Sequence, residues 1–221
     1  LATLAACASG GSGSGTGDTG QTLRVAVKGG SGDTLDPHIT PATQGDLVRI
    51  GNLYDGLTAY GHDGKLEYRL AESMTPNDDA TVWTIALRDD VKFHDGNPMT
   101  ADDVVASIAR IKNPDNAAKG APLLAFIPDG GVKAVDEHTV EIDLGAPYGP
   151  LPERWASPYL DIVPADFDPV KPVGSGPFEY SEFVPGQHSL FTANEDYWDG
   201  APKVGALDVI TFDDNQAQRS E

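Results

Sequence analysis

Apolar and polar residues alternate along several parts of this chain, and that alternation predicts strands with one buried face. In the segment 81–87, for example, Trp83, Ile85 and Leu87 occupy one face and the residues between them occupy the other. Short apolar runs on both sides of His62-Asp63-Gly64 predict a hairpin. The other predicted strands and hairpins cover residues 23–27, 132–144, 178–183 with 188–193, and 207–212.

Two further segments have the period of an amphipathic helix. Between residues 43 and 54 the apolar positions recur at helical spacing, up to a stop at Gly56. A second helix is predicted to begin at Thr100 as N-cap, followed by two acids in its first turn, and to end before Asn113-Pro114. Helices interleaved with strands predict a mixed α/β protein, and the chain contains no internal repeat.

The charge of the chain argues against two classes of partner. The 221 residues carry a formal net charge of −19, whereas nucleic acids and anionic membrane surfaces bind basic faces. A hydrophobic content of 39% is enough for a core, and no segment approaches the roughly 20 consecutive apolar residues of a membrane span. The single cysteine excludes an internal disulfide framework and argues against a cysteine-based zinc site.

No group of residues has the spacing of a catalytic or metal site. Gly174-Ser175-Gly176 lacks the last glycine of a nucleophile elbow, because Pro177 takes that position, and a turn explains it better. His94-Asp95-Gly96 also predicts a turn, since no second histidine or cysteine lies at ligand spacing. Asp36 and His38 are two positions apart, and no pattern places both in one cavity. We therefore expect neither enzymatic activity nor a metal or cofactor, although carboxylates paired by folding remain open.

Four linked pieces of the sequence resemble one known family. They are Leu70-Ala71-Glu72-Ser73, Trp83-Thr84-Ile85-Ala86-Leu87-Arg88, Val91-Lys92-Phe93-His94-Asp95-Gly96 and Thr100-Ala101-Asp102-Asp103-Val104. Their order and spacing are similar to the core motif of the family 5 extracellular solute-binding proteins, receptors that deliver peptides, nickel and other small solutes to ABC importers. Further similar pieces extend the resemblance to residues 22–212: Leu35-Asp36-Pro37-His38, Asn52-Leu53-Tyr54-Asp55-Gly56-Leu57, Val173-Gly174-Ser175-Gly176-Pro177-Phe178 and Asn194-Glu195-Asp196-Tyr197-Trp198.

The resemblance implies a fold and a division into domains. The family has a type II periplasmic-binding fold, in which two lobes close over a ligand and an extra domain is inserted in the first lobe. By this pattern residues 21–48 and 172–221 form lobe I, and residues 49–171 form the inserted domain. Family members are about twice this length or longer, so we expect this chain to be a piece that lacks the second lobe and to be poorly folded by itself.

The same resemblance implies two ligand-contact regions. One is the loop after the first strand together with the start of the following helix, and the other lies where the inserted domain returns to lobe I. For Trp155 and Tyr159 ordinary core packing is an equal alternative, and Trp83 and Trp198 are expected in the core. The predicted ligand contacts are Asp33, Thr34, Thr40, Gln44, Trp155, Ser157 and Tyr159.

The N-terminal segment Leu4-Ala5-Ala6-Cys7 resembles a bacterial lipobox, in which the cysteine thiol receives a diacylglycerol. Residues 1–7 would then be the end of a lipoprotein signal peptide. The Gly/Ser-rich residues 8–20 predict a flexible tether that reaches about 20 Å. The alternative is a cysteine without function in an unstructured N-terminus.

These expectations combine into one function. We expect a monomeric, lipid-anchored, extracytoplasmic receptor that binds an oligopeptide or dipeptide and passes it to the permease subunits of an ABC transporter, without cofactor and without nucleic acid. Within the family, a nickel chelate, haem or oligosaccharide is the alternative ligand. A lipoprotein hydrolase, or a surface receptor without a transport role, is the alternative outside it.

Overall fold

A computed structural model describes residues 20–212 of the chain. The predicted lipidation site Cys7 lies outside the described residues. The elements are β1 (Thr22–Lys28), α1 (Gln44–Leu53), β2 (Thr58–Tyr60), β3 (Leu66–Tyr68), β4 (Ala71–Pro76), β5 (Val82–Leu87), α2 (Ala101–Lys112), β6 (Val132–Asp136), β7 (Thr139–Asp143), α3 (Leu151–Trp155), β8 (Phe178–Val184), β9 (His188–Ala193) and β10 (Ala206–Phe212), with short 3-10 turns at Pro114–Asn116 and Ala121–Leu124.

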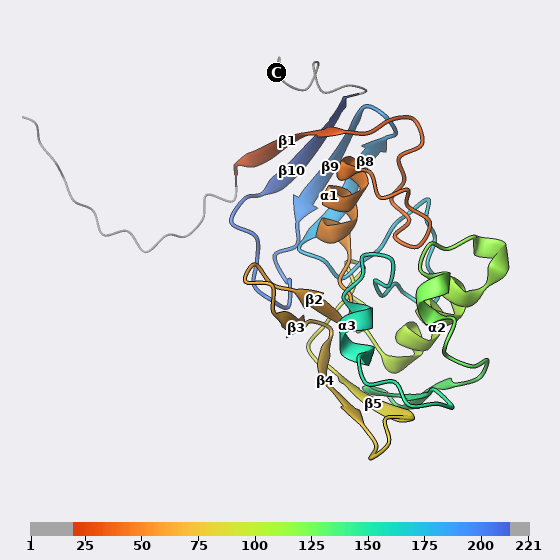
Figure 1. The fold of residues 1–221 in the computed structure, drawn as a ribbon. Coiled ribbons are helices and arrows are strands. Elements are labelled where there is room, and N and C mark those ends of the chain that lie inside the picture. The colour runs from red at the N-terminus through yellow and green to blue at the C-terminus, as the bar shows by residue number, and fades with distance from the viewer. Residues whose placement is uncertain (1–19, 213–221) are drawn as a thin grey trace, which may run out of the picture.

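The first described strand and the last three build one sheet, which carries α1 on one face (Figure 1). Its strand order is β1-β10-β9-β8, with β1 parallel to β10 and the other pairs antiparallel. The parallel pair joins segments that are far apart in the sequence, as Val25 pairs with Val209. Apolar residues of this sheet, of α1 and of two loops form the first core: Val27, Leu35, Ile50, Leu53, Tyr54, Val163, Phe178, Phe191, Leu207 and Val209.

The middle of the chain builds a second antiparallel sheet, in the order β4-β5-β7-β6, against which α2 packs. The three predicted inward residues of β5, Trp83, Ile85 and Leu87, are all buried there. They belong to a second core together with the apolar stripe of α2 and the fully buried Trp155 of α3. The small hairpin of β2 and β3 lies beside α3.

The two cores divide the chain at other positions than the sequence predicts. Tyr54 belongs to the first core and Leu57 to the second, and on the return Ile162 belongs to the second and Val163 to the first. The predicted boundary after residue 48 falls inside α1, whose buried residues pack on the first sheet and cannot be separated from it. The chain therefore crosses between the cores at residues 54–57 and 162–163.

Most predicted elements are present, with their expected ends. Thr43 and Thr100 cap α1 and α2 in capping boxes, with Asp46 and Asp103 as the reciprocal acids. Two elements were not predicted, because β4 buries only two of its six residues and α3 is five residues long. Within residues 20–212, every helix is too short or too polar to cross a membrane.

The turn predicted at Gly174-Ser175-Gly176 packs its backbone directly on the end of α1. The Gly176 N–H donates to Leu53 O at 3.0 Å, and Ser175 between the two glycines is fully buried. A Cβ atom on Gly174 would lie 1.9 Å from Leu53 O, and one on Gly176 would lie 2.6 Å from Asn52 O. Both positions therefore require glycine for the close approach of the return segment to the first core.

We expect Gly174→Ala to destabilise the protein strongly, because the added methyl group meets backbone that cannot move aside. Overpacking of this kind costs about 1–3 kcal/mol or more. The matched control is Gly149→Ala, since a Cβ atom at Gly149 meets nothing within 4 Å. Thermal unfolding of the full-length protein should show a melting temperature several degrees lower for the first variant only. Equal melting temperatures for both variants would contradict the packing argument.

Candidate functional site

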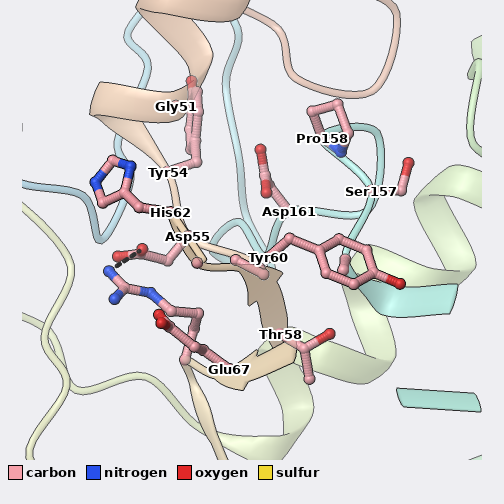
Figure 2. A pocket seen from close by; sticks show the side chains of 15 residues that line it. Gly51, Tyr54, Asp55, Thr58, Tyr60, His62, Glu67, Ser157, Pro158 and Asp161 are labelled. Atoms are coloured by element: carbon pink, nitrogen blue, oxygen red, sulfur yellow. Dashed lines mark hydrogen bonds and ion pairs between the residues drawn. The ribbon is translucent and has the colours of Figure 1, made fainter. Parts of the chain in front are cut away.

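An open pocket of about 640 Å³ lies where the two cores meet. Its walls come from the end of α1, from the β2–β3 hairpin and from residues 156–161, which lead back to the first core (Figure 2). The volume lies within the ~300–1,000 Å³ that small-molecule sites occupy. Both polar and aromatic side chains line it, among them Tyr60 and Ser157.

One wall of the pocket is built by the buried carboxylate of Asp55. It pairs with Arg69 at 3.3 Å, accepts from the Tyr197 hydroxyl at 3.2 Å, and accepts from the Trp198 indole N–H at 3.1 Å. Burial raises the pKa of Asp55, while Arg69 and the hydrogen bonds act against that increase. Arg69 is held further by Asp199 at 2.8 Å, and its guanidinium lies over the Trp198 ring. The charge of Asp55 is therefore compensated within the protein.

A second buried carboxyl group, that of Asp161, faces the same pocket. Asp161 is 8% exposed, and Figure 2 shows it between Tyr54 and Pro158. Among the described residues its carboxyl oxygens have neither a hydrogen-bond donor nor a cationic partner. Burial raises the pKa of Asp161 well above its ordinary value, and the negative charge of Asp55 raises it further. Asp161 is thus a buried acid without a counter-ion among residues 20–212.

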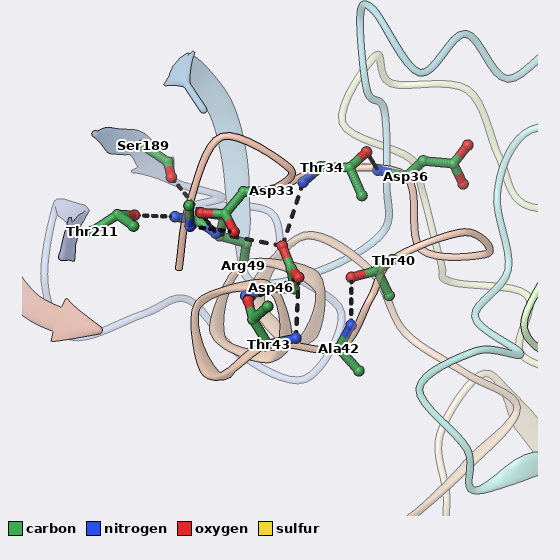
Figure 3. A network of polar contacts seen from close by, with 11 residues as sticks. Asp33, Thr34, Asp36, Thr40, Ala42, Thr43, Asp46, Arg49, Ser189 and Thr211 are labelled. Carbon is green, nitrogen blue, oxygen red and sulfur yellow. Dashed lines mark hydrogen bonds and ion pairs between the residues drawn. The ribbon is translucent and has the colours of Figure 1, made fainter. Parts of the chain in front are cut away.

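The loop after β1 is held by a fully buried arginine of α1 (Figure 3). The Arg49 guanidinium pairs with Asp33 at 3.0 Å and with Asp46 at 3.5 Å. Its other nitrogens donate to Ser189 Oγ at 2.6 Å and to Thr211 Oγ1 at 2.5 Å, on β9 and β10. One buried cation therefore fastens the loop, the helix and the sheet to one another.

The same loop contains a strained residue before the start of α1. Ala42 has a φ of 58°, a left-handed conformation that is uncommon for a residue with a side chain. The Ala42 N–H donates to Thr40 Oγ1 at 3.2 Å, and Thr43 then caps the helix. Thr40 is fully buried, so its side chain supports the shape of the loop from inside.

His38 connects the two regions that the sequence predicts as ligand contacts. Its Nε2 lies 2.9 Å from Asp161 O, and because a carbonyl only accepts, Nε2 carries the proton. Nδ1 then accepts from Arg110 at 2.6 Å, and Arg110 also binds the carboxylate of Asp36. The His38 carbonyl accepts from the Lys119 N–H at 2.7 Å. Burial, as the main cause, lowers the pKa of His38 to about 4, so the imidazole is neutral at physiological pH.

The predicted contacts fall into two groups. Asp33, Thr40 and Trp155 are buried: Asp33 pairs with Arg49, and Trp155 packs in the second core, the alternative that the sequence left open. The side chains that reach the surface are those of Thr34, Gln44, Ser157 and Tyr159. Of the predicted contacts, Ser157 is the residue that lines the pocket. Whether these residues touch a ligand stays a prediction.

The sequence patterns do not identify the charged residues that organise the site. Asp55 and Tyr197 were part of the quoted family pieces, but nothing in the sequence placed them in contact across the fold. Asp161 did have a signal, since it is an acid next to the apolar residues 160, 162 and 163. Among residues 20–212 there is no group of three or more His, Cys, Asp or Glu that could hold a metal ion.

We expect Arg49→Met to cost about 3–5 kcal/mol, because it leaves the carboxylates of Asp33 and Asp46 buried without their cation. Arg24→Met is the matched control, since the Arg24 side chain is 74% exposed and pairs with Asp208 at the surface. Denaturant unfolding of the full-length protein measures both. A loss of stability as small as that of the control would show that the buried network contributes little.

The lowered pKa of His38 gives a pH dependence with a defined sign. The unfolded chain binds a proton at His38 below pH 6.5, and the folded chain only below about 4. The contribution of neutral His38 to the free energy of unfolding is therefore complete above pH 6.5. It is lost as the pH falls toward 4, by about 3 kcal/mol at 1.36 kcal/mol per pH unit. We expect His38→Gln to reduce this loss, whereas His62→Gln, at an exposed turn, should not. Unfolding free energies measured from pH 4 to 7 decide this, and identical slopes for all three proteins would contradict it.

Residues 65–220 match the family described as "Bacterial extracellular solute-binding proteins, family 5 Middle". The "Nickel-binding periplasmic protein" of Escherichia coli K12 is 32% identical over 187 residues, which are 80% of this chain and 34% of that protein. The "Periplasmic oligopeptide-binding protein OppA" of the same strain is 32% identical over 217 residues, which are 87% of this chain and 39% of OppA.

Solved structures agree with these sequence matches. The binding protein AgaA in complex with agropinic acid, from A. tumefaciens R10, has a TM-score of 0.80 at 33% identity, over 90% of this chain and 41% of AgaA. NikZ from Campylobacter jejuni in complex with Ni(L-His) has a TM-score of 0.80 at 26% identity, over 90% of this chain and 41% of NikZ. The predicted type II periplasmic-binding fold is thus confirmed, and the chain spans about two fifths of the length of these relatives.

Proposed function

This chain belongs to the bacterial extracellular solute-binding proteins of family 5, and we propose that it is part of a receptor that binds a small solute for an ABC importer. The observation that carries the proposal is the junction at His38. There the loop after β1, which is predicted to contact the ligand, is joined to Asp161, which lines an open pocket and lies two residues after the second predicted contact region, residues 155–159. Binding without chemistry is the activity that this arrangement supports.

The proposed domains follow the two cores. The first core, with α1 and its sheet, belongs to lobe I, and the second core is the inserted domain. Lobe I supplies the loop 33–44, and the inserted domain supplies the segment 157–161. A second lobe would close over both and exclude water, which strengthens each polar contact to the ligand.

A short peptide is the proposed ligand, because OppA, one of the similar relatives, is named for oligopeptide binding. The proposed contacts are the exposed side chain of Gln44 and the half-buried side chains of Thr34, Ser157 and Tyr159. Asp33, Thr40 and Trp155 hold the segments that carry them. A nickel chelate is the second candidate, since another relative at the same identity is named for nickel binding.

The proposed location is extracytoplasmic, as the relatives are named periplasmic proteins. Cys7 is the proposed site of lipidation, and the Gly/Ser-rich residues 8–20 are the tether to the membrane. Two acyl chains anchor a protein stably, because each buried CH₂ contributes about 0.8 kcal/mol. The permease subunits of the importer are the proposed partners of the monomeric receptor.

Ligand-dependent stabilisation of the full-length protein tests the proposed function. Binding to the folded state alone adds about 2.7 kcal/mol when the ligand is present at 100 times its Kd. We expect a mixture of di- to pentapeptides to raise the melting temperature, and Tyr159→Ala to reduce that increase. Tyr68→Ala is the control, at an exposed tyrosine on β3.

The alternative ligand separates in the same experiment. A shift with nickel–histidine complexes but not with peptides would favour the second candidate. No change in melting temperature with either ligand would contradict the proposed site. An increase that Tyr159→Ala leaves unchanged would also contradict it, because Tyr159 is proposed to touch the ligand.

A further inference from the structure

We infer that the pocket between the two cores binds the cationic end of a ligand, an ammonium or guanidinium group, with the carboxylate of Asp161 as its counter-ion. The inference does not rest on peptide being the solute, although Ser157, one of the proposed peptide contacts, also lines the pocket. It follows from one unpaired acid, the way its backbone is fixed, and the charge and volume of the pocket that it faces.

The position of Asp161 is fixed by backbone hydrogen bonds on both sides. Its carbonyl accepts from His38, and the next N–H, of Ile162, donates to Asp55 O at 3.0 Å. The N–H of Val163 donates to Ser107 Oγ at 3.0 Å. The backbone that carries this carboxyl group is therefore held at the pocket wall.

The protein supplies no partner for this acid among its described residues. A nine-tenths buried carboxylate is expensive unless it is paired or hydrogen-bonded, and almost all such groups have partners. The three buried acids around Arg49 and Arg110 illustrate the ordinary case: Asp33, Asp46 and Asp36 each have an arginine. Asp161 differs from these three acids because its carboxyl group lines the pocket and has no arginine beside it among the described residues.

The charge of the pocket favours a cation. Its lining contains three acids, Asp55, Glu67 and Asp161, and one arginine, Arg69. Arg69 is already shared by Asp55 and Asp199, so it is not available to Asp161. A cation that enters the pocket is attracted by this excess of negative charge and meets one free carboxylate.

The size of the pocket and its donor set favour an organic cation over a metal ion. The volume of about 640 Å³ is far larger than a bare ion needs. The described residues offer no group of three metal-binding side chains. Tyr54 and Tyr60 also line the pocket, and aromatic walls suit the apolar part of an amine or guanidine.

Binding of a cation at Asp161 must be linked to protons. Burial and the charge of Asp55 raise the pKa of Asp161, and a cationic partner lowers it, so binding of a cation to the protonated acid releases a proton. Affinity for the cation should therefore increase with pH through the range in which Asp161 ionises. The other titratable or charged groups that face the pocket are Tyr54, Asp55, Tyr60, His62, Glu67 and Arg69.

The test uses the full-length protein and agmatine, which has a guanidinium and an ammonium group. Isothermal titration calorimetry should detect agmatine but not uncharged 1,5-pentanediol. Titrations in buffers of different ionisation enthalpy should show proton release. We expect Asp161→Asn to weaken agmatine binding at least about tenfold, the effect of losing a charge-assisted hydrogen bond. The control Asp63→Asn, an exposed acid on the neighbouring turn, should leave the affinity unchanged.

The melting temperature of Asp161→Asn distinguishes loss of the site from loss of the fold. A raised carboxyl pKa means that ionised Asp161 destabilises the folded state at neutral pH, so the neutral amide should melt at the same temperature or higher. No agmatine binding to the unmodified protein, or equal binding to Asp161→Asn, would overturn the inference.

Competition shows which ligand carries the cation. If saturating peptide abolishes agmatine binding, the cation is part of the transported solute. If both bind together, the pocket is a separate site. Both results support the counter-ion role of Asp161, and neither depends on whether peptide is the solute.

Discussion

The arrangement of the two cores depends on the ion pair and the hydrogen bonds of the Asp55 carboxylate. Asp55 lies in the crossing between them, directly after Tyr54 of the first core and before Leu57 of the second. It binds Arg69, which precedes β4, and the segment after β9 through Tyr197 and Trp198. Removing a carboxylate from water is costly, and one charged and two neutral donors offset that cost at this position. The junction between the two cores therefore has a defined geometry, and the pocket beside it has a defined shape.

This pairing also decides which charges remain open. Arg69 is the cation in the wall of the pocket, and Asp55 and Asp199 occupy both sides of its guanidinium. The neighbouring acid Asp161 is left without a counter-ion in the part of the chain that the structure describes. The polar network between the two cores thus uses the arginine of the pocket, and the negative charge of the pocket stays uncompensated.

The sequence predicted local structure well and contacts across the fold poorly. Thr43 and Thr100 as helix starts, and the inward face of β5, depend on residues a few positions apart, so periodicity and capping rules identify them. The partners of Arg49 on β9 and β10 are separated from it by 140 and 162 residues. No local pattern records such a pair. The domain boundary expected after residue 48 likewise falls inside α1, and only the fold shows that buried residues of this helix belong to the first core.

Asp33 and Asp161 show how the presence of a counter-ion separates a structural acid from the acid that we propose to bind a ligand. The family resemblance implied Asp33 as a ligand contact, because the family meets its ligand in the loop after the first strand. Both acids are buried to a similar degree, 7% and 8% exposed, so exposure does not distinguish them. The distinction is the counter-ion: Asp33 has Arg49 at 3.0 Å, and its charge is used within the fold. Asp161 has its backbone fixed but its charge unused, and a fold retains such a group at a cost in stability. That cost is recovered only when a partner from outside the described chain supplies the positive charge.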